Sequence, residues 1–186
     1  LFPAEGDMDA VAEVRMPWFD TSRRNKFSRF FATIGWSLTQ PGKLMSSIPE
    51  GLGVGSGLVF LASIQLVSLS FAFFPMILVV GLPRLMGGPG PGVYELFNYI
   101  MFPVGLYLMV LIHGLLAHLV LACTGNIKSG LSRTILASTF SGGPFILCAV
   151  PCVGMCIFPV SFVWWLVAMI IMVQVGQAVS GLRATI

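Results

Sequence analysis

Long stretches without a charged side chain determine the architecture that this sequence predicts. The longest covers 49 residues, 134–182, and two shorter ones cover 51–83 and 96–127. A membrane-spanning helix needs roughly 20 mostly apolar residues, so each shorter stretch can hold one span and the longest can hold two. The pattern predicts an all-α, polytopic integral membrane protein with a four-helix transmembrane domain over 49–186. The expected spans are about 52–82, 94–123, 134–153 and 160–180.

Glycine and proline mark where these spans are expected to end. A Gly- and Pro-rich loop over 87–92 separates the first two spans, and Pro151, Gly154 and Pro159 mark a turn between the last two. Barrel strands are excluded, because the apolar runs do not alternate and are far longer than such strands.

A basic segment over 23–48 precedes the first span. Its apolar residues recur at helical spacing, with Trp36 at their boundary, and Pro41 and Gly42 follow. This pattern predicts an interfacial amphipathic helix, although a helix packed on a soluble domain has the same pattern. The bases expected to meet anionic headgroups are Arg23, Arg24, Lys26 and Arg29.

Residues 1–22 are rich in acids and are expected to form a poorly ordered tail. No signal peptide is expected, since the first apolar run lies far from Leu1.

The distribution of lysine and arginine predicts the orientation. Six bases precede the first span, Arg84 alone follows it, Lys128 and Arg133 follow the second, and no base lies in the turn after the third. The positive-inside rule then places both termini in the cytoplasm. Trp164 and Trp165 are expected at the lipid interface, near the start of the last span.

Composition excludes several functional classes. The chain is 56 % hydrophobic and 9 % charged, whereas soluble domains carry roughly 25 % charged residues. No nucleic-acid-binding surface is visible. Apart from Glu95 at the start of the second span, the predicted spans hold no Asp, Glu, Lys or Arg, and phosphate-loop, GxSxG and HExxH motifs are absent. We therefore expect no enzyme activity and no catalytic residue.

Histidine and cysteine are the only candidates for cofactor or metal chemistry. His113 and His118 lie about 140° apart on one helix, so they do not form a two-histidine clamp. Each can ligate a haem or chlorin, or form a hydrogen bond between helices. Cys148, Cys152 and Cys156 recur every four residues, a spacing that suits either copper(I) or simple packing. No cofactor and no metal site are predicted, with a haem or chlorin as the alternative.

Small residues on two predicted spans indicate close contacts between helices. Gly53 and Gly57 form a GxxxG pair, and Gly176 and Ser180 form a second small-residue pair. These pairs are expected to pack either within the chain or against another subunit.

The order of several short motifs resembles the Yip family, the membrane domain named for Ypt/Rab-interacting proteins. The resemblance covers roughly 26–186. Its residues include Phe30-Phe31, Gln40-Pro41, Ala117-His118-Leu119, Gly125, Arg133, Pro144, Val150-Pro151-Cys152-Val153-Gly154, Trp164-Trp165 and Ser180-Gly181-Leu182-Arg183-Ala184. The acidic, aromatic-containing motif that eukaryotic members carry before the first span is absent, and residues 138–144 lack the usual Tyr and Ala-Pro. A bacterial-type member in the inner membrane is therefore implied, and no Rab-type GTPase partner is expected.

These features together favour a non-enzymatic membrane protein that acts as a structural or accessory subunit or in membrane organisation. Its expected partners are the bilayer and other integral membrane proteins or further copies of itself. A His-ligated cofactor-binding or metal-binding subunit and a small transporter or channel are the alternatives.

Overall fold

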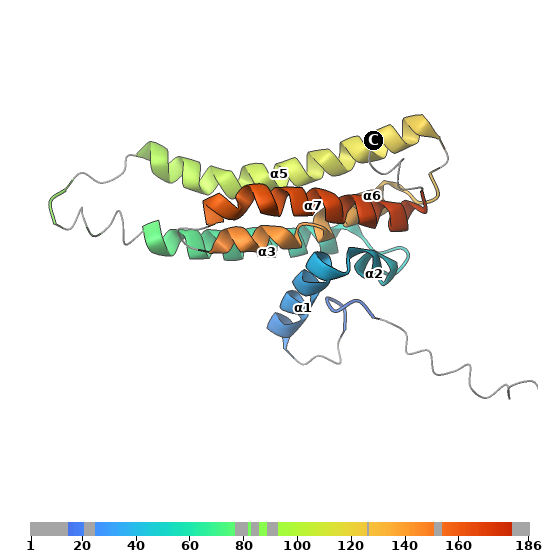
Figure 1. Ribbon diagram of the computed structural model, residues 1–186, viewed down its shortest axis with the longest axis horizontal. Coiled ribbons are helices and arrows are strands. Elements are labelled where there is room, and N and C mark those ends of the chain that lie inside the picture. Colours follow the sequence, from blue (N-terminus) through green and yellow to red (C-terminus); the bar gives the residue numbers. More distant parts are fainter. Residues whose placement is uncertain are drawn as a thin grey trace, which may run out of the picture.

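The computed structural model describes residues 15–20, 25–76, 82, 86–88, 93–125, 127–150 and 154–179. Within these ranges the regular structure is entirely helical. Three long helices follow the long axis of the molecule (Figure 1). They are α3 (Val54–Met76), α5 (Val93–Thr124) and α7 (Gly154–Gln177). Each is long and apolar enough to cross a membrane, in agreement with the predicted first, second and fourth spans.

A short, interrupted segment lies at the centre of these helices. It consists of α6 (Leu131–Phe140) and a 3-10 helix, η3 (Gly143–Ala149). α6 contacts α3, α5 and α7, while η3 contacts α1, α3 and α7. Every residue over 134–145 is buried. The predicted third span, 134–153, is therefore not one continuous helix.

The interruption has a local cause in the sequence. Gly142 separates the two parts, and Gly143 and Pro144 begin η3. Pro144 has no N–H to donate to the carbonyl of Phe140, and its ring would clash with that carbonyl in a continuing α-helix. The chain therefore leaves α-helical geometry at Ser141 and resumes as a tighter 3-10 turn.

The interrupted segment runs antiparallel to α7. At one end, the side chain of Gln177 bonds to Thr134, and at the other the rings of Phe145 and Phe158 lie 6.5 Å apart. α7 begins at Gly154, so Pro159 lies inside the helix and not in the expected turn.

Two helices precede the bundle and lie together on one flank of it (Figure 1). They are α1 (Lys26–Thr39) and α2 (Pro41–Ser46), and α1 runs across the direction of the long helices. The side chain of Asn25 caps α1 by accepting a hydrogen bond from the N–H of Phe27 at 3.0 Å. The stop at Thr39 agrees with the predicted end of the basic helix, but Pro41 also begins α2, as proline favours the first helical turn.

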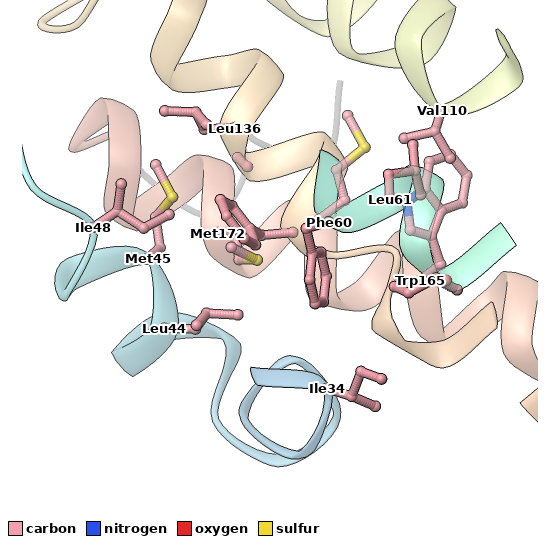
Figure 2. Close-up of a cluster of buried hydrophobic side chains, with 14 of the residues drawn as sticks. Ile34, Leu44, Met45, Ile48, Phe60, Leu61, Val110, Leu136, Trp165 and Met172 are labelled. Atoms are coloured by element: carbon pink, nitrogen blue, oxygen red, sulfur yellow. The ribbon is translucent and has the colours of Figure 1, made fainter. Parts of the chain in front are cut away.

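The hydrophobic core joins both flanking helices to the bundle. Figure 2 shows buried side chains from α1, α2, α3, α5, α6 and α7 gathered around Phe60 and Met172. The labelled residues are Ile34, Leu44, Met45, Ile48, Phe60, Leu61, Val110, Leu136, Trp165 and Met172. α2 is therefore part of the core and is not only a surface turn.

Residues 15–20 also dock on the bundle. They form a turn in which the N–H of Phe19 donates to the carbonyl of Met16 at 3.0 Å, and Met16 is only 1 % exposed. The ring of Trp18 meets that of Phe60 edge-on at 5.3 Å. The sequence pointed to a poorly ordered tail here and gave no sign of this turn.

Candidate functional site

A buried hydrogen-bond network joins α5, α6 and α7 at the end of the bundle where α7 finishes. Gln177 is its centre and is 1 % exposed. Its amide nitrogen donates to Thr134 Oγ1 at 2.8 Å and to the carbonyl of Gly130 at 3.4 Å. Its amide oxygen accepts from the N–H of Ser129 at 3.1 Å. One side chain therefore fixes the start of α6 against the end of α7.

The two histidines take part in different contacts. His118 extends the Gln177 network, because its Nδ1 lies 3.0 Å from Thr134 Oγ1. Nδ1 of His113 lies 2.9 Å from the carbonyl of Met109. A carbonyl only accepts, so a neutral His113 carries its proton on Nδ1 and keeps a lone pair on Nε2. Its ring meets the ring of Trp165 edge-on at 5.3 Å.

Arg133 connects the start of α6 to the end of α2. Its guanidinium donates to the carbonyls of Ile48 at 2.9 Å, Pro49 at 3.4 Å and Met45 at 3.2 Å. These carbonyls include orphan acceptors of the helix end, and a cation suits that end of the helix dipole. The guanidinium keeps its charge at any physiological pH.

The interrupted segment is packed closely against its neighbours. A Cβ added at Gly57 would meet Thr139 Oγ1 on α6. A Cβ at Gly142 would lie 2.7 Å from Leu61 Cδ1, and one at Gly143 would lie 2.6 Å from Ser37 Oγ. The glycines therefore permit helix approaches that no other residue permits without a shift.

Polar groups inside this packed region differ in how well they are paired. Ser138 Oγ donates to the carbonyl of Val110 at 2.6 Å, and the indole nitrogen of Trp165 lies 3.5 Å from the carbonyl of Ser138. Four buried side-chain atoms of the described residues have no hydrogen-bond partner, and three of them belong to this region: Ser37 Oγ, Gln65 Nε2 and Ser161 Oγ. A buried polar group without a hydrogen bond costs about 1–3 kcal/mol of folding free energy, so each of these atoms destabilises the interior.

The small residues predicted to pack between helices have different surroundings. Gly57 packs against α6, and Gly176 packs against Met45, whose Cε would lie 2.5 Å from an added Cβ. Nothing lies within 4 Å of a Cβ added at Gly53. Ser180 lies outside the described residues. The described contacts are made within the chain.

The residues predicted at the lipid interface also differ in their surroundings. Trp164 is 47 % exposed and donates to the carbonyl of Leu38 at 3.0 Å, whereas Trp165 is fully buried. Trp165 lies in the core because adjacent helical residues point about 100° apart, so only one of the pair can face outward. Trp36 carries Lys43 Nζ at 4.6 Å above its ring. Arg23 and Arg24 lie outside the described residues.

Sequence reasoning missed the role of Arg133 and the linkage through Thr134. The available signal was position, because Arg133 is the last charge before the longest uncharged stretch, and a lone charge there needs partners. Within the described ranges, no three His, Cys, Asp or Glu residues are grouped to hold a metal ion.

No family model, curated protein or solved structure matches the chain. The resemblance to the Yip family therefore stays a prediction from the order and spacing of its short motifs.

Proposed function

We propose that this protein is a non-enzymatic subunit of a membrane assembly, in which it acts through packing and not through chemistry. In this proposal four segments cross the bilayer: α3, α5 and α7 as continuous helices, and α6–η3 as an interrupted fourth. A bacterial inner membrane with both termini in the cytoplasm is the setting that the sequence pattern favours. Yip-like membership is part of the same proposal.

The closely filled centre of the bundle carries this proposal. The enclosed segment over 134–145 has no exposed residue, and Gly57, Gly142 and Gly143 meet neighbouring side chains wherever a Cβ would be added. α6 and η3 together extend about 29 Å at about 1.5 and 2.0 Å per residue, close to the thickness of the hydrocarbon core. A segment of this length, enclosed by three apolar helices, suits a fourth crossing that is shielded from lipid.

The outer surface of α5 supports contacts outside the chain. Exposed apolar residues follow one side of this helix at spacings of three and four. They are Met101, Val104, Leu108, Ile112, Leu115 and Leu119. A stripe of this kind meets either lipid tails or another membrane helix, and it supports an embedded subunit in both cases.

Labelling from the two sides of the membrane tests the crossings. In a cysteine-free background, we expect Lys128→Cys to react from the cytoplasmic side and Gly88→Cys from the opposite side. A tag at the C-terminus should be accessible from the same side as position 128. Labelling of positions 88 and 128 from one side would overturn the proposed topology.

Photo-crosslinking and native mass measurement test the assembly. A photo-reactive residue at Leu115, which is 50 % exposed, should crosslink to another membrane protein or a second copy. The same residue at Leu106, 6 % exposed, is the matched control and should crosslink only within the chain. Purification in mild detergent should give a discrete complex by native mass. A lone monomer in every detergent, together with crosslinks to lipid alone, would refute the assembly role.

One observation favours a small transporter as a second candidate. The interrupted segment resembles the broken helices that expose backbone at transporter sites, and Gln65 Nε2 and Ser161 Oγ are buried without partners. Solute flux into proteoliposomes that is lost in Gln65→Leu and Ser161→Ala would favour this candidate. Leak rates equal to those of empty vesicles for all tested solutes would leave the packing role.

A cofactor-binding subunit is the third candidate, and it rests on His113. Its Nδ1–H is held by the carbonyl of Met109, the arrangement that commonly orients a ligating histidine through its other nitrogen. A Soret or chlorin absorption band of the purified protein, lost in His113→Ala but kept in His118→Ala, would support axial ligation by His113. A colourless preparation from the native membrane would exclude it.

A further inference from the structure

A cavity of about 180 Å³ lies beside the first turn of α1. Its lining includes Trp18, Lys26 and Arg29. The cavity is smaller than the roughly 300–1,000 Å³ of a site for a drug-sized ligand, so it suits a small group or the tip of a larger molecule. Two of these three lining side chains are permanent cations at neutral pH.

Within the described part of the chain, the charge in this cavity lacks a counter-ion. Among the described residues, no carboxylate lies within ion-pair distance of Lys26 or Arg29. Arg29 Nε is buried and has no hydrogen-bond partner. A buried donor of a guanidinium is expensive to leave unpaired, and a bidentate oxyanion is the ligand that its fork geometry matches best.

The helix itself increases the need for an anion. The N-terminus of a helix carries about half a positive charge, so acids are favoured there and bases are not. The first turn of α1 contains no acid, and both Lys26 and Arg29 lie in its first four residues. An anion in the cavity would therefore interact favourably with two side chains and with the helix dipole.

The wall opposite the bases is held in place by packing. Trp18 lies against two rings, 5.3 Å from Phe60 and 6.4 Å from Phe30. Met16, two residues earlier, is buried. The cavity thus has an aromatic side that is held by packing and a basic side.

The outer side of α1 indicates where the anion comes from. Phe27 and Phe31 are 72 % and 55 % exposed, although both are large and apolar. They lie about 160° around the helix from Arg29, so one flank of α1 is basic and the opposite flank is apolar. A helix with these two flanks suits a membrane surface, with phenyl rings toward acyl chains and bases toward headgroups.

We propose that Trp18, Lys26 and Arg29 form a binding site for the phosphate of an anionic phospholipid. The ligand chemistry is a phosphate oxyanion, held by the guanidinium of Arg29 and the ammonium of Lys26. A lipid, and not a free phosphate or an acidic protein segment, is its source, because the apolar flank adjoins the same helix turn. This inference rests on the proposed membrane embedding.

Native mass spectrometry of the full chain, released from nanodiscs of defined composition, tests the site. The wild-type protein should retain phosphatidylglycerol about 10-fold more strongly than phosphatidylcholine. Arg29→Gln should lose most of this preference, and Arg29→Lys should keep the charge but recover only part of it. Lys128→Gln removes one exposed base from the 125–130 link and should bind like the wild type.

Three outcomes would overturn the inference. One is an Arg29→Gln variant that keeps the full preference, and another is an equal loss in Lys128→Gln, which would indicate only general surface charge. The third is displacement of the lipid by millimolar inorganic phosphate or by an acidic peptide, which would make the lipid source wrong. Far-UV circular dichroism of each variant confirms folding. If the chain does not enter nanodiscs at all, the embedding proposal fails, and that result is distinct from the loss of lipid preference.

Discussion

The contact between Gly57 on α3 and Thr139 on α6 gives the most direct test of the packed centre. In Gly57→Ala the new Cβ would meet Thr139 Oγ1 and would lie 3.1 Å from Leu136 Cδ2. Thr139 is fully buried, and its hydroxyl already donates to the carbonyls of Ile135 and Leu136 at 2.9 and 3.1 Å. Either the hydroxyl must rotate away from these bonds, or α6 must move away from α3.

The magnitude follows from three contributions. Overpacking of a filled core costs about 1–3 kcal/mol, and a lost hydrogen bond of Thr139 costs about 1 kcal/mol. The replacement of a helical glycine by alanine returns up to about 1 kcal/mol. We expect Gly57→Ala to reduce the free energy of unfolding by about 1–3 kcal/mol.

Gly55, two residues earlier on α3, is the matched control. Nothing lies within 4 Å of a Cβ added there, so Gly55→Ala should be neutral or stabilising by up to about 1 kcal/mol. Thermal denaturation in one detergent, followed by circular dichroism, compares the two variants. At about 2–4 °C per kcal/mol for a chain of this size, Gly57→Ala should melt roughly 2–12 °C below the wild type.

A double-mutant cycle decides whether the contact itself is responsible. Thr139→Ala removes Oγ1, the atom nearest to the new methyl, so Gly57→Ala should cost less in that background, with a coupling energy of about 1 kcal/mol. Equal melting temperatures for Gly57→Ala and Gly55→Ala, or a coupling energy of zero, would show that α3 and α6 do not approach as closely as described.

Three further predictions concern the links between helices. Gln177→Ala should lower the free energy of unfolding by about 1–3 kcal/mol in a denaturant titration, because Thr134 and the N–H of Ser129 lose their hydrogen-bond partner. The control, Gln174→Ala, should change this free energy by less than about 0.5 kcal/mol. Arg133→Met should release the end of α2 and speed chymotrypsin cleavage between 44 and 52 at least about 10-fold, with Lys128→Met as the control. Unchanged cleavage would contradict the idea that the hydrogen bonds of Arg133 hold the end of α2. Trp165→Ala should cost about 3–5 kcal/mol in thermal denaturation, and Trp164→Ala, which loses an exposed ring and one hydrogen bond, should cost clearly less.

The long helices were predictable because a single physical constraint determines them. A charge is expensive in an apolar interior, so the uncharged stretches predicted the position and approximate length of α3, α5 and α7, although the longest stretch was expected to hold two continuous spans. The same constraint cannot detect the interruption at Gly142. After Arg133 near its start, α6 is as free of charge as η3, and the absence of charge does not distinguish an α-helix from a 3-10 turn. The relevant signal was local, in Gly142, Gly143 and Pro144.

The candidate site was predictable only in part, for a related reason. Helical spacing correctly separated His113 from His118, because rotation per residue is fixed by backbone geometry. It did not reveal that His118 and Gln177 share Thr134, since such a contact depends on how three helices pack. Trp165 shows the same limit: residue type favoured an interface, but its rotation about α7 places it in the core.

The apolar face of α1 has two different environments in the structure, one buried against the bundle and one exposed, and the sequence pattern does not separate them. Phe27, Phe30, Phe31 and Ile34 fall within about 100° of arc and were predicted to share one face. In the structure that face is divided, because Phe30 and Ile34 are buried against the bundle while Phe27 and Phe31 remain exposed. A helix that only lay on a membrane would turn all four toward lipid, and a helix that only packed on protein would bury all four. The periodicity therefore marked one apolar face correctly but could not show that the bundle covers only part of it, and contact of the exposed part with lipid stays a prediction.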